Sequence, residues 1–271
     1  MTERETKIFE RLREHYEEAL QYFPADRIVG IFVQGSQNYN LDYEKSDLDT
    51  KLIVVPTFEE IAMNRKLVST THVRANDEHI DFKDIRLYMD TFKKQNLNFL
   101  EILFTEFAFI NPLYMPQWRR LIDAREQIAH MNPRRAVKSM KGVAMEKYHA
   151  MEKPYPSKID IINEHGYDGK QAHHLMRVED YIERYINGES YVSCLKPSSD
   201  KVERMMAYKR QEIPLEVARI EADRMIAHVT EMADKFCESA PEAEDPAMVK
   251  LLEEVQYEIM KIAIKEELRE E

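Results

Sequence analysis

Residues 27–56 have the sequence RIVGIFVQGSQNYNLDYEKSDLDTKLIVVP, and this stretch decides the fold. Two of its segments, residues 27–34 and 47–55, are rich in Ile, Val, Leu and Phe, and polar, turn-prone residues separate them. Apolar runs of this length, bounded by Gly and Pro, predict buried β-strands. We expect the first strand to end at Gly35 and the second at Pro56.

Two aspartates, Asp47 and Asp49, stand at the start of the second predicted strand. Residues two apart in a strand face the same side, so both carboxylates should project together while Leu48 points into the core. We expect no lysine to pair with them, and such a pair suits Mg²⁺, which takes oxygen ligands from one or two carboxylates and substrate phosphates. Gly35 would let the backbone approach a phosphate closely, and Ser36 could donate its hydroxyl to that phosphate.

A third aspartate lies further along the chain. Residues 67–74 and 79–85 predict a hairpin around a turn-prone Ala-Asn-Asp sequence. Asp81 stands between two apolar residues of the second hairpin strand, so its carboxylate should leave the sheet on the side opposite to them. If that strand lies beside residues 47–55, the three acids converge on one place.

The remaining sequence predicts mostly helix. Residues 3–23 and 86–105 have apolar residues at helical spacing, and a short strand is expected at residues 107–110. The helices expected after it cover residues 116–131, 133–153, 169–187, 199–211, 214–237 and 246–270. We therefore predict an α+β fold in which a small mixed β-sheet occupies residues 1–115 and an all-helical domain, residues 116–271, closes the cleft.

The pattern of acids and turn residues resembles a known superfamily. Gly35-Ser36, ten further residues, Asp-Leu-Asp and an isolated aspartate in a later strand are similar to the DNA polymerase β nucleotidyltransferase superfamily. Within it, three stretches resemble the predicted nucleotidyltransferases associated with RNA repair, namely residues 35–49, 80–86 and 96–104. Residues 170–175 and Arg177 resemble the second-domain signature of that group. The resemblance implies a nucleotidyltransferase fold.

The resemblance also implies a reaction. Asp47 and Asp49 would hold two Mg²⁺ or Mn²⁺ ions, and Asp81 would help to bind one of them and activate an acceptor hydroxyl. A nucleoside monophosphate would pass from an NTP to the acceptor with release of pyrophosphate. The chain departs from the family at Asn40, where many relatives carry glycine. Asparagine tolerates the left-handed backbone conformation better than most residues, so we expect the turn to survive.

Two predicted helices carry basic and aromatic side chains on one face. The first face contains Arg134, Lys138, Lys141 and Tyr148, and the second contains Lys170, His174, Arg177, Tyr181 and Arg184. Our hypothesis is that at least one of these faces lines the cleft opposite the acids and neutralises the triphosphate. The candidate nucleotide-binding residues are therefore Gly35, Ser36, Lys138, Lys141, Lys170, His174 and Arg177. The alternative is that both faces are ordinary solvated surfaces, as runs of charge usually are.

Three other features allow a structural interpretation. Glu101 either supports the candidate site or is an exposed helical glutamate. The single tryptophan, Trp118, is expected to pack in a core rather than to stack on a base. A zinc site built from His165, His173 and His174 is disfavoured, because no acidic or cysteine ligand has suitable spacing.

Composition limits the partners and the compartment. The 271 residues carry a net charge of -11, which disfavours a long footprint on a phosphate backbone but permits a short RNA end. Cys194 and Cys237 have no metal-type spacing and are expected to be reduced, as in the cytoplasm. We expect neither a signal peptide nor a membrane span. The acceptor could be an RNA end, which the resemblance favours, a small hydroxylated molecule or a protein.

Alternatives to an RNA-modifying enzyme stay open at this point. A protein-AMPylating enzyme of the antitoxin type would use the same chemistry and transfer the label from ATP to a protein. A non-catalytic nucleotide- or RNA-binding module would bind NTP without a requirement for metal. A helical interaction protein with incidental acids would show no rise in melting temperature on addition of NTP.

Overall fold

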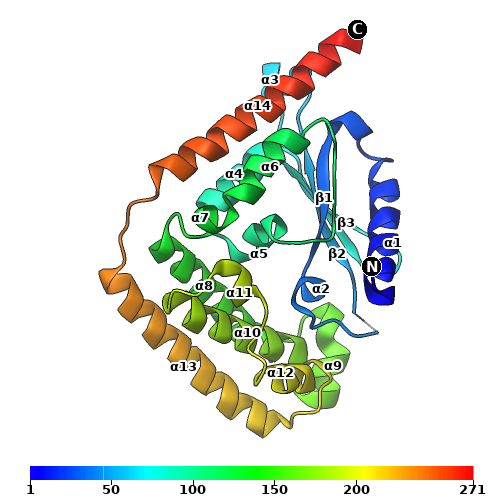
Figure 1. The fold of residues 1–271 in the computed structure, drawn as a ribbon. Coiled ribbons are helices and arrows are strands. Elements are labelled where there is room, and N and C mark those ends of the chain that lie inside the picture. Colours follow the sequence, from blue (N-terminus) through cyan, green and yellow to red (C-terminus); the bar gives the residue numbers. More distant parts are fainter. Residues whose placement is uncertain (45, 271) are drawn as a thin grey trace. The chain divides into compact units, whose positions relative to one another are not determined.

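A five-stranded mixed β-sheet forms the centre of the first part of the chain (Figure 1). The computed structural model describes residues 1–44 and 46–270. The strand order is β3-β4-β2-β1-β5. The strands are β1 (Ile28–Gln34), β2 (Asp49–Val54), β3 (Ser69–Val73), β4 (His79–Asp84) and β5 (Ala108–Ile110). All five predicted strands are thus present, and the fold is α+β as expected.

Among the described strands, β2 and β4 form the one parallel pair of the sheet. β1 pairs antiparallel with both β2 and β5, and β3 and β4 form the predicted antiparallel hairpin. In the parallel pair, Thr50 lies opposite Ile80 and Lys51 lies opposite Asp81. The expected neighbour relation between the strand carrying Asp49 and the strand carrying Asp81 is therefore confirmed.

One face of the sheet is covered by helix α1 (Glu3–Ala19). Its Ile8 and Leu12 belong to the same buried cluster as Leu48, Leu52 and Phe82, together with other strand residues. Full burial of each such side chain stabilises the fold by roughly 1.5–3 kcal/mol. Because strand residues alternate, the burial of Leu48 and Leu52 directs Asp49 and Lys51 to the other face of the sheet.

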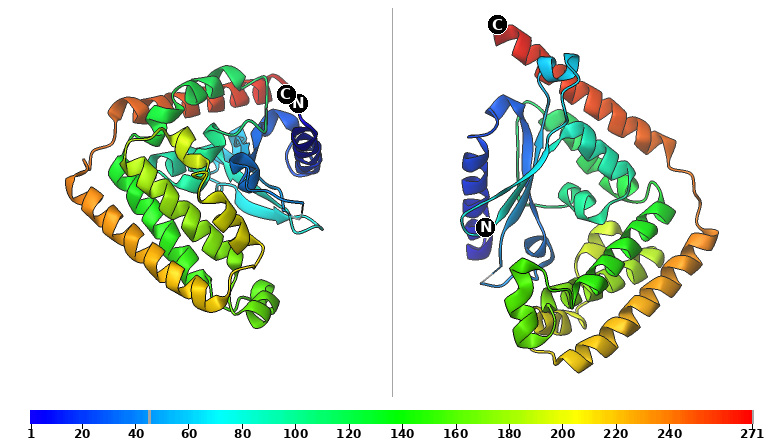
Figure 2. Two further views of the ribbon diagram at one scale, coloured as in Figure 1. Left: turned by 60° about the horizontal axis from the view of Figure 1, so that its bottom comes forward. Right: turned by 180° about the vertical axis from the view of Figure 1, so that it is seen from behind.

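Helices on the other side of the sheet complete the first unit (Figure 2). These include α4 (Ile85–Lys93), α5 (Leu97–Leu100) and α6 (Met115–Asp123). Trp118 of α6 is fully buried and its ring lies 5.0 Å from that of Phe32, so its packing role is confirmed. Residues 86–105 do not form the single helix that was predicted. The backbone of Gln95 has a φ of +54°, in the left-handed region, and this ends the run after α4.

The chain folds into two compact units. Unit 1 contains residues 1–131 and 244–271, and unit 2 contains residues 132–243. This division differs from the predicted boundary after residue 115, because α6, α7 (Arg125–Ala129) and α14 (Pro246–Glu270) lie in unit 1. In α14 the apolar residues Leu252, Val255 and Ile259 are fully buried, so this helix covers the core of unit 1. Sequence periodicity identifies such a stripe but cannot say which helices it packs against.

Ion pairs reinforce the attachment of α14 to unit 1. The guanidinium group of Arg120, on α6, donates to Glu254 and Glu258 of α14, each at 2.9 Å. Lys93 at the end of α4 pairs with Glu253 at 3.0 Å. The shorter elements of this unit are η1 (Ala25–Arg27), α2 (Ser36–Tyr39), α3 (Phe58–Ala62) and η2 (Glu101–Leu103).

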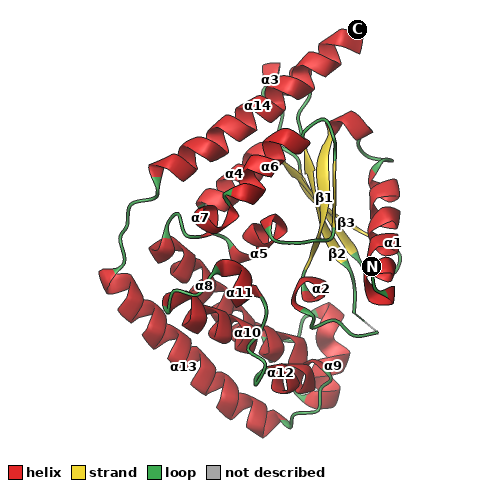
Figure 3. Cartoon of the chain, viewed as in Figure 1, coloured by secondary structure: helices red, strands yellow, loops and turns green. Residues whose placement is uncertain are grey.

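Unit 2 is all-helical within its described residues (Figure 3). Its elements are α8 (Pro133–Ala150), η3 (Pro156–Lys158), α9 (Ile159–His165), α10 (Gly169–Ile186), α11 (Tyr191–Leu195), α12 (Val202–Lys209) and α13 (Leu215–Ser239). Helices α8, α10 and α13 pack against one another. The predicted core positions of α10, Leu175, Val178 and Ile182, are buried as expected. None of the described helices of the chain combines the length and the apolar character that crossing a bilayer requires.

A buried polar network ties α1 to the loops that enter β2 and β4. Glu78 is 2% exposed, and its carboxylate accepts from Arg11, from Arg74 at 2.8 Å and from the backbone N–H of Leu48 at 3.2 Å. His15 joins this network with its Nε2 2.9 Å from Glu78 Oε2 and its Nδ1 3.0 Å from the hydroxyl of Thr50. A buried charge needs such partners, so the network fixes the backbone between Asp47 and Asp49 from the α1 side of the sheet.

The network predicts a pH dependence of stability. Burial and the guanidinium groups of Arg74 and Arg11 lower the pKa of His15 to about 3, although the charge of Glu18 opposes this shift. In the unfolded chain the pKa of histidine is about 6.5, so acid protonates the unfolded state first. Below that value His15 should therefore reduce the free energy of unfolding by about 1.4 kcal/mol per pH unit.

Urea unfolding of the protein and of His15→Gln between pH 7 and pH 5 measures this effect. As the pH falls, the free energy of unfolding should decrease more in the parent protein than in His15→Gln, because only the parent has this buried imidazole. A difference that stays constant over this range would show that His15 does not titrate as described.

Candidate functional site

The face of the sheet opposite α1 carries two of the three predicted acids, Asp49 and Asp81. Asp49 and Lys51 alternate along β2, and His79 and Asp81 alternate along the parallel strand β4, all on this face. Asp81 lies opposite Lys51 in the register, so Asp49 is its diagonal neighbour. Strand spacing and rise place the backbones of Asp49 and Asp81 about 8 Å apart. Asp47 lies two residues before Asp49, and its backbone carbonyl accepts from Gln37 Nε2 at 2.7 Å.

The carboxylates are held by groups of the protein itself. Asp49 Oδ1 accepts from the backbone N–H of His79, and the Nδ1 atom of the same residue lies 3.0 Å from that oxygen. Asp81 pairs with Lys51 Nζ at 3.3 Å and accepts from the hydroxyl of Thr71 at 3.4 Å. Within residues 1–44 and 46–270, no three His, Cys, Asp or Glu side chains are grouped so that they could hold a metal ion. Asp49 and Asp81 share a face, whereas Asp47 precedes β2 and the charge of its carboxylate acts on Arg11 of α1, so the three side chains are not gathered into a ready ligand set.

Lys51 is a charged residue of this face that was not predicted from the sequence. The expectation of no lysine partner concerned Asp47 and Asp49, whereas the ammonium of Lys51 pairs with Asp81 and its side chain is only 6% exposed. Nζ also lies 4.1 Å from the ring centroid of Phe99 in α5. Burial lowers the pKa of Lys51, and the charge of Asp81 opposes this effect. The signal was present in the sequence, because Lys51 continues the two-residue alternation of Asp47 and Asp49.

The Gly-Ser turn is anchored by a buried glutamate. Gly35 has a φ of +93° and a ψ of -146°, a conformation that favours glycine, and its N–H donates to Glu101 Oε1 at 2.6 Å. Asn38 Nδ2 donates to the same oxygen at 3.1 Å, and the hydroxyl of Tyr39 donates to the other. Glu101 is 1% exposed, so the alternative that it is an exposed helical residue is wrong. The N–H of Gly35 is committed to this carboxylate.

The remaining parts of the turn agree with the sequence. Ser36 begins the short helix α2 and is partly exposed. Asn40 has a φ of +58°, which confirms that asparagine takes the left-handed conformation at this position. The turn therefore forms with asparagine in the left-handed position.

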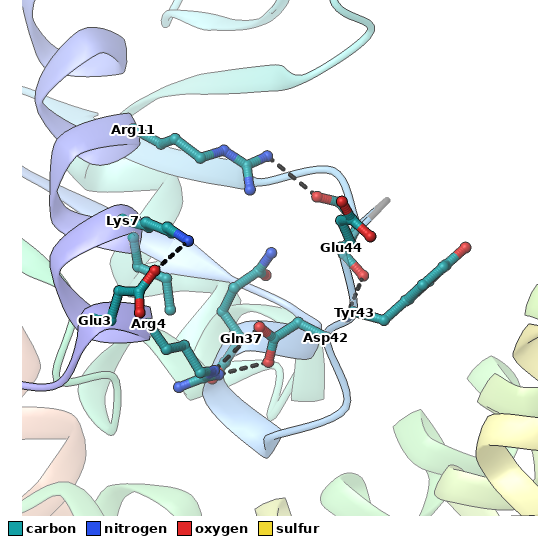
Figure 4. Close-up of a pocket in the computed structure, with 10 residues that line it drawn as sticks. Glu3, Arg4, Lys7, Arg11, Gln37, Asp42, Tyr43 and Glu44 are labelled. Carbon is teal, nitrogen blue, oxygen red and sulfur yellow. Dashed lines mark hydrogen bonds and ion pairs between the residues drawn. The ribbon is translucent and has the colours of Figure 1, made fainter.

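A pocket of about 540 Å³ lies beside this turn, between α1 and residues 37–46 (Figure 4). Three basic residues of α1, Arg4, Lys7 and Arg11, line it at helical spacing. Each is paired with an acid: Arg4 with Asp42, Lys7 with Glu3 and Arg11 with Glu78. The sequence analysis missed this cluster, although positions i, i+3 and i+7 would have placed it on one helix face. Its charges are balanced internally, so it does not form a strong anion site by itself.

The first basic face of unit 2 is partly engaged with α13. Lys141 pairs with Asp234 at 2.6 Å, and the hydroxyl of Tyr148 donates to Asp223 at 2.6 Å. Lys138 is exposed. These contacts give Lys141 a structural role in joining α8 to α13.

The second basic face lies on α10. Arg177 is 5% exposed, whereas Lys170 and His174 are partly exposed. Burial, the neighbouring His173 and Arg177 lower the pKa of His174 well below its usual value, so the ring is neutral near pH 7 and adds no charge there. His173 is buried, with its Nδ1 2.9 Å from the carbonyl oxygen of Met205. The residues of this face belong to unit 2, whereas the acids and the Gly-Ser turn belong to unit 1.

Comparisons with known proteins add no family to this picture. No family model matches the chain, and no curated protein matches it.

Gly35 gives a direct test of the turn. Gly35→Ala should lower the free energy of unfolding by about 1–3 kcal/mol, because a φ of +93° is strained for alanine although the space for its Cβ is open. Gly142 of α8 is a matched control, since its Cβ position is equally open and its backbone is helical. Gly142→Ala should be neutral or stabilise by up to about 1 kcal/mol. Equal effects of the two substitutions in urea unfolding would contradict the strain at Gly35.

Proposed function

We propose that the chain is a metal-dependent nucleotidyltransferase that moves a nucleoside monophosphate from an NTP to a hydroxyl acceptor. The observation that carries the proposal is the placement of Asp49 and Asp81 on one face of two adjacent parallel strands. The Gly35-Ser36 turn follows β1, which pairs with β2, so it lies at the same end of the strands as Asp49. The resemblance to the DNA polymerase β superfamily rests on these same residues.

The donor chemistry of the acids fits Mg²⁺ or Mn²⁺. Asp47, Asp49 and Asp81 offer only oxygen ligands, which hard divalent cations prefer, and all three are partly exposed. When bound, two such ions would supply positive charge beside the attacking and leaving oxygens. The side chains of Asp49 and Asp81 would have to leave their present partners, His79 and Lys51, to serve as ligands.

The protein groups around the acids have separate roles in the proposal. Asp81 accepts the proton of the acceptor hydroxyl, and Ser36 donates its hydroxyl to a phosphate oxygen. Glu101 is a positioning residue, because its carboxylate accepts hydrogen bonds from Gly35, Asn38 and Tyr39 and so fixes the turn. In unit 2, Lys138, Lys170 and Arg177 stay candidate phosphate-binding residues as predicted from the sequence. His174 and Lys141 are weaker candidates, because His174 is neutral near pH 7 and Lys141 is paired with Asp234.

We favour an RNA end as the acceptor. A short RNA end is compatible with the net charge of -11, whereas a long duplex footprint is not favoured. A small hydroxylated molecule or a protein hydroxyl is the alternative outcome of the same experiment.

The experiment is incubation with each α-³²P-labelled NTP, Mg²⁺ or Mn²⁺, and a pool of short RNA and protein acceptors. We expect a labelled product that identifies the nucleotide and the acceptor class together. The double variant Asp47→Asn, Asp49→Asn should reduce its formation by at least about a hundredfold, because it removes the charge that holds the ions. Lys250→Gln, at an exposed position of α14, is a control that should leave the rate unchanged.

Label on protein instead of RNA would establish the AMPylating alternative. Nucleotide binding without any labelled product, and without dependence on metal or on Asp47 and Asp49, would establish the non-catalytic module and contradict the proposed reaction. The side chains of Asp49 and Asp81 already have internal partners, which is the observation that favours this second candidate.

A further inference from the structure

Lys51 occupies an unusual position for a charged residue. Its ammonium lies between the carboxylate of Asp81, at 3.3 Å, and the face of Phe99, with 4.1 Å to the ring centroid. The side chain is only 6% exposed, whereas that of Asp81 is 23% exposed. Lys83, two residues further along β4 than Asp81, holds its own ammonium 4.4 Å from the centroid of the same ring.

Stability alone gives little reason for a lysine at this position. Removing an ammonium from water costs free energy, and a buried ion pair often recovers no more than a well-packed apolar pair would contribute. A leucine at position 51 would pack against Phe99 without this cost. The positive charge therefore requires an explanation in terms of what the carboxylate face binds.

The charge of Lys51 acts directly on any cation that approaches Asp81. It neutralises the carboxylate that would otherwise attract the ion, and it repels a divalent ion placed within a few ångströms of it. Both effects lower the affinity of the acids for a metal ion that arrives alone. An anionic triphosphate that arrives with the metal ion offsets the positive charge of the ammonium and so removes the repulsion between Lys51 and the ion.

We propose that Lys51 is a gating residue of the acidic site, which keeps Asp81 from binding a divalent ion in the absence of nucleotide. The inference rests on the proposed function, because it assigns Asp81 a metal. When a metal–nucleotide complex enters, the ammonium leaves Asp81 and is retained by the ring of Phe99 through a cation–π contact. The site thereby selects the metal complex of the nucleotide over the free ion.

Binding of Mn²⁺ alone, followed by electron paramagnetic resonance, tests the gate without any measurement of activity. Lys51→Gln removes the charge and keeps an amide that can donate to Asp81. It should bind Mn²⁺ about tenfold more tightly than the parent protein. Lys51→Arg keeps the charge and should leave the affinity low.

Lys83→Gln is the matched control, since Lys83 shares the ring of Phe99 whereas the ammonium paired with Asp81 is that of Lys51. It should change the affinity by less than about threefold. Adding Asp81→Asn to Lys51→Gln should abolish the gain. Circular dichroism of each variant verifies that the fold is retained, and the Lys51→Arg result stands if the glutamine variant is unstable.

The outcomes separate the two proposals. The gate is wrong if Mn²⁺ binding requires Asp81 but is equally tight in the parent protein and in Lys51→Gln. It is also wrong if Lys51→Arg binds Mn²⁺ as tightly as we expect of the glutamine variant. In either case the proposed function stands. If no variant shows Mn²⁺ binding that depends on Asp81, the metal site itself is absent and both proposals fail.

Discussion

The parallel pairing of β2 with β4 is the constraint on which the candidate site depends. It sets Lys51 opposite Asp81 and makes Asp49 and Asp81 diagonal neighbours. A register shift of one residue would turn one set of charged side chains toward α1 and bring Ile80 or Leu52 to the other face. The apolar cluster between the sheet and α1 prevents such a shift, because Leu52 and Phe82 would lose their buried positions.

Two buried carboxylates, those of Glu78 and Glu101, fix the loop between β1 and β2. Glu78 joins α1 to the segment that contains Asp47 and Asp49, through Arg11, His15 and the N–H of Leu48. Glu101 joins η2 to the Gly35 turn. Each carboxylate is almost fully buried and has several donors, which is the condition under which a buried charge is tolerated. The two ends of the loop between β1 and β2 are therefore fixed by polar contacts.

The acidic face also carries the groups that hold its carboxylates. Asp49 lies against His79, and Asp81 pairs with the ammonium of Lys51. In the proposed reaction a metal ion would have to compete with both contacts, so residue 51 would affect the affinity of the acids for the ion. The ring of Phe99, in α5, contacts the ammonium groups of both Lys51 and Lys83, so α5 helps to position these charges. The chemistry proposed for the chain therefore depends on a balance of charges within one sheet face.

The sequence by itself determined the strands, the turn at Gly35, the left-handed Asn40 and the core side of α10, because each follows from local apolar periodicity or from backbone preference. It also placed Asp49 and Asp81 on one face, since alternation fixes the face once the strands are known, whereas Asp47 lies before β2 and alternation does not reach it. The tertiary structure decided what those side chains contact. The partners of Asp81, Glu101 and α14 come from segments distant in sequence, and no local pattern specifies which of them approach. For this reason the pairing of Lys51 with Asp81 and the return of α14 to unit 1 emerged only from the folded chain.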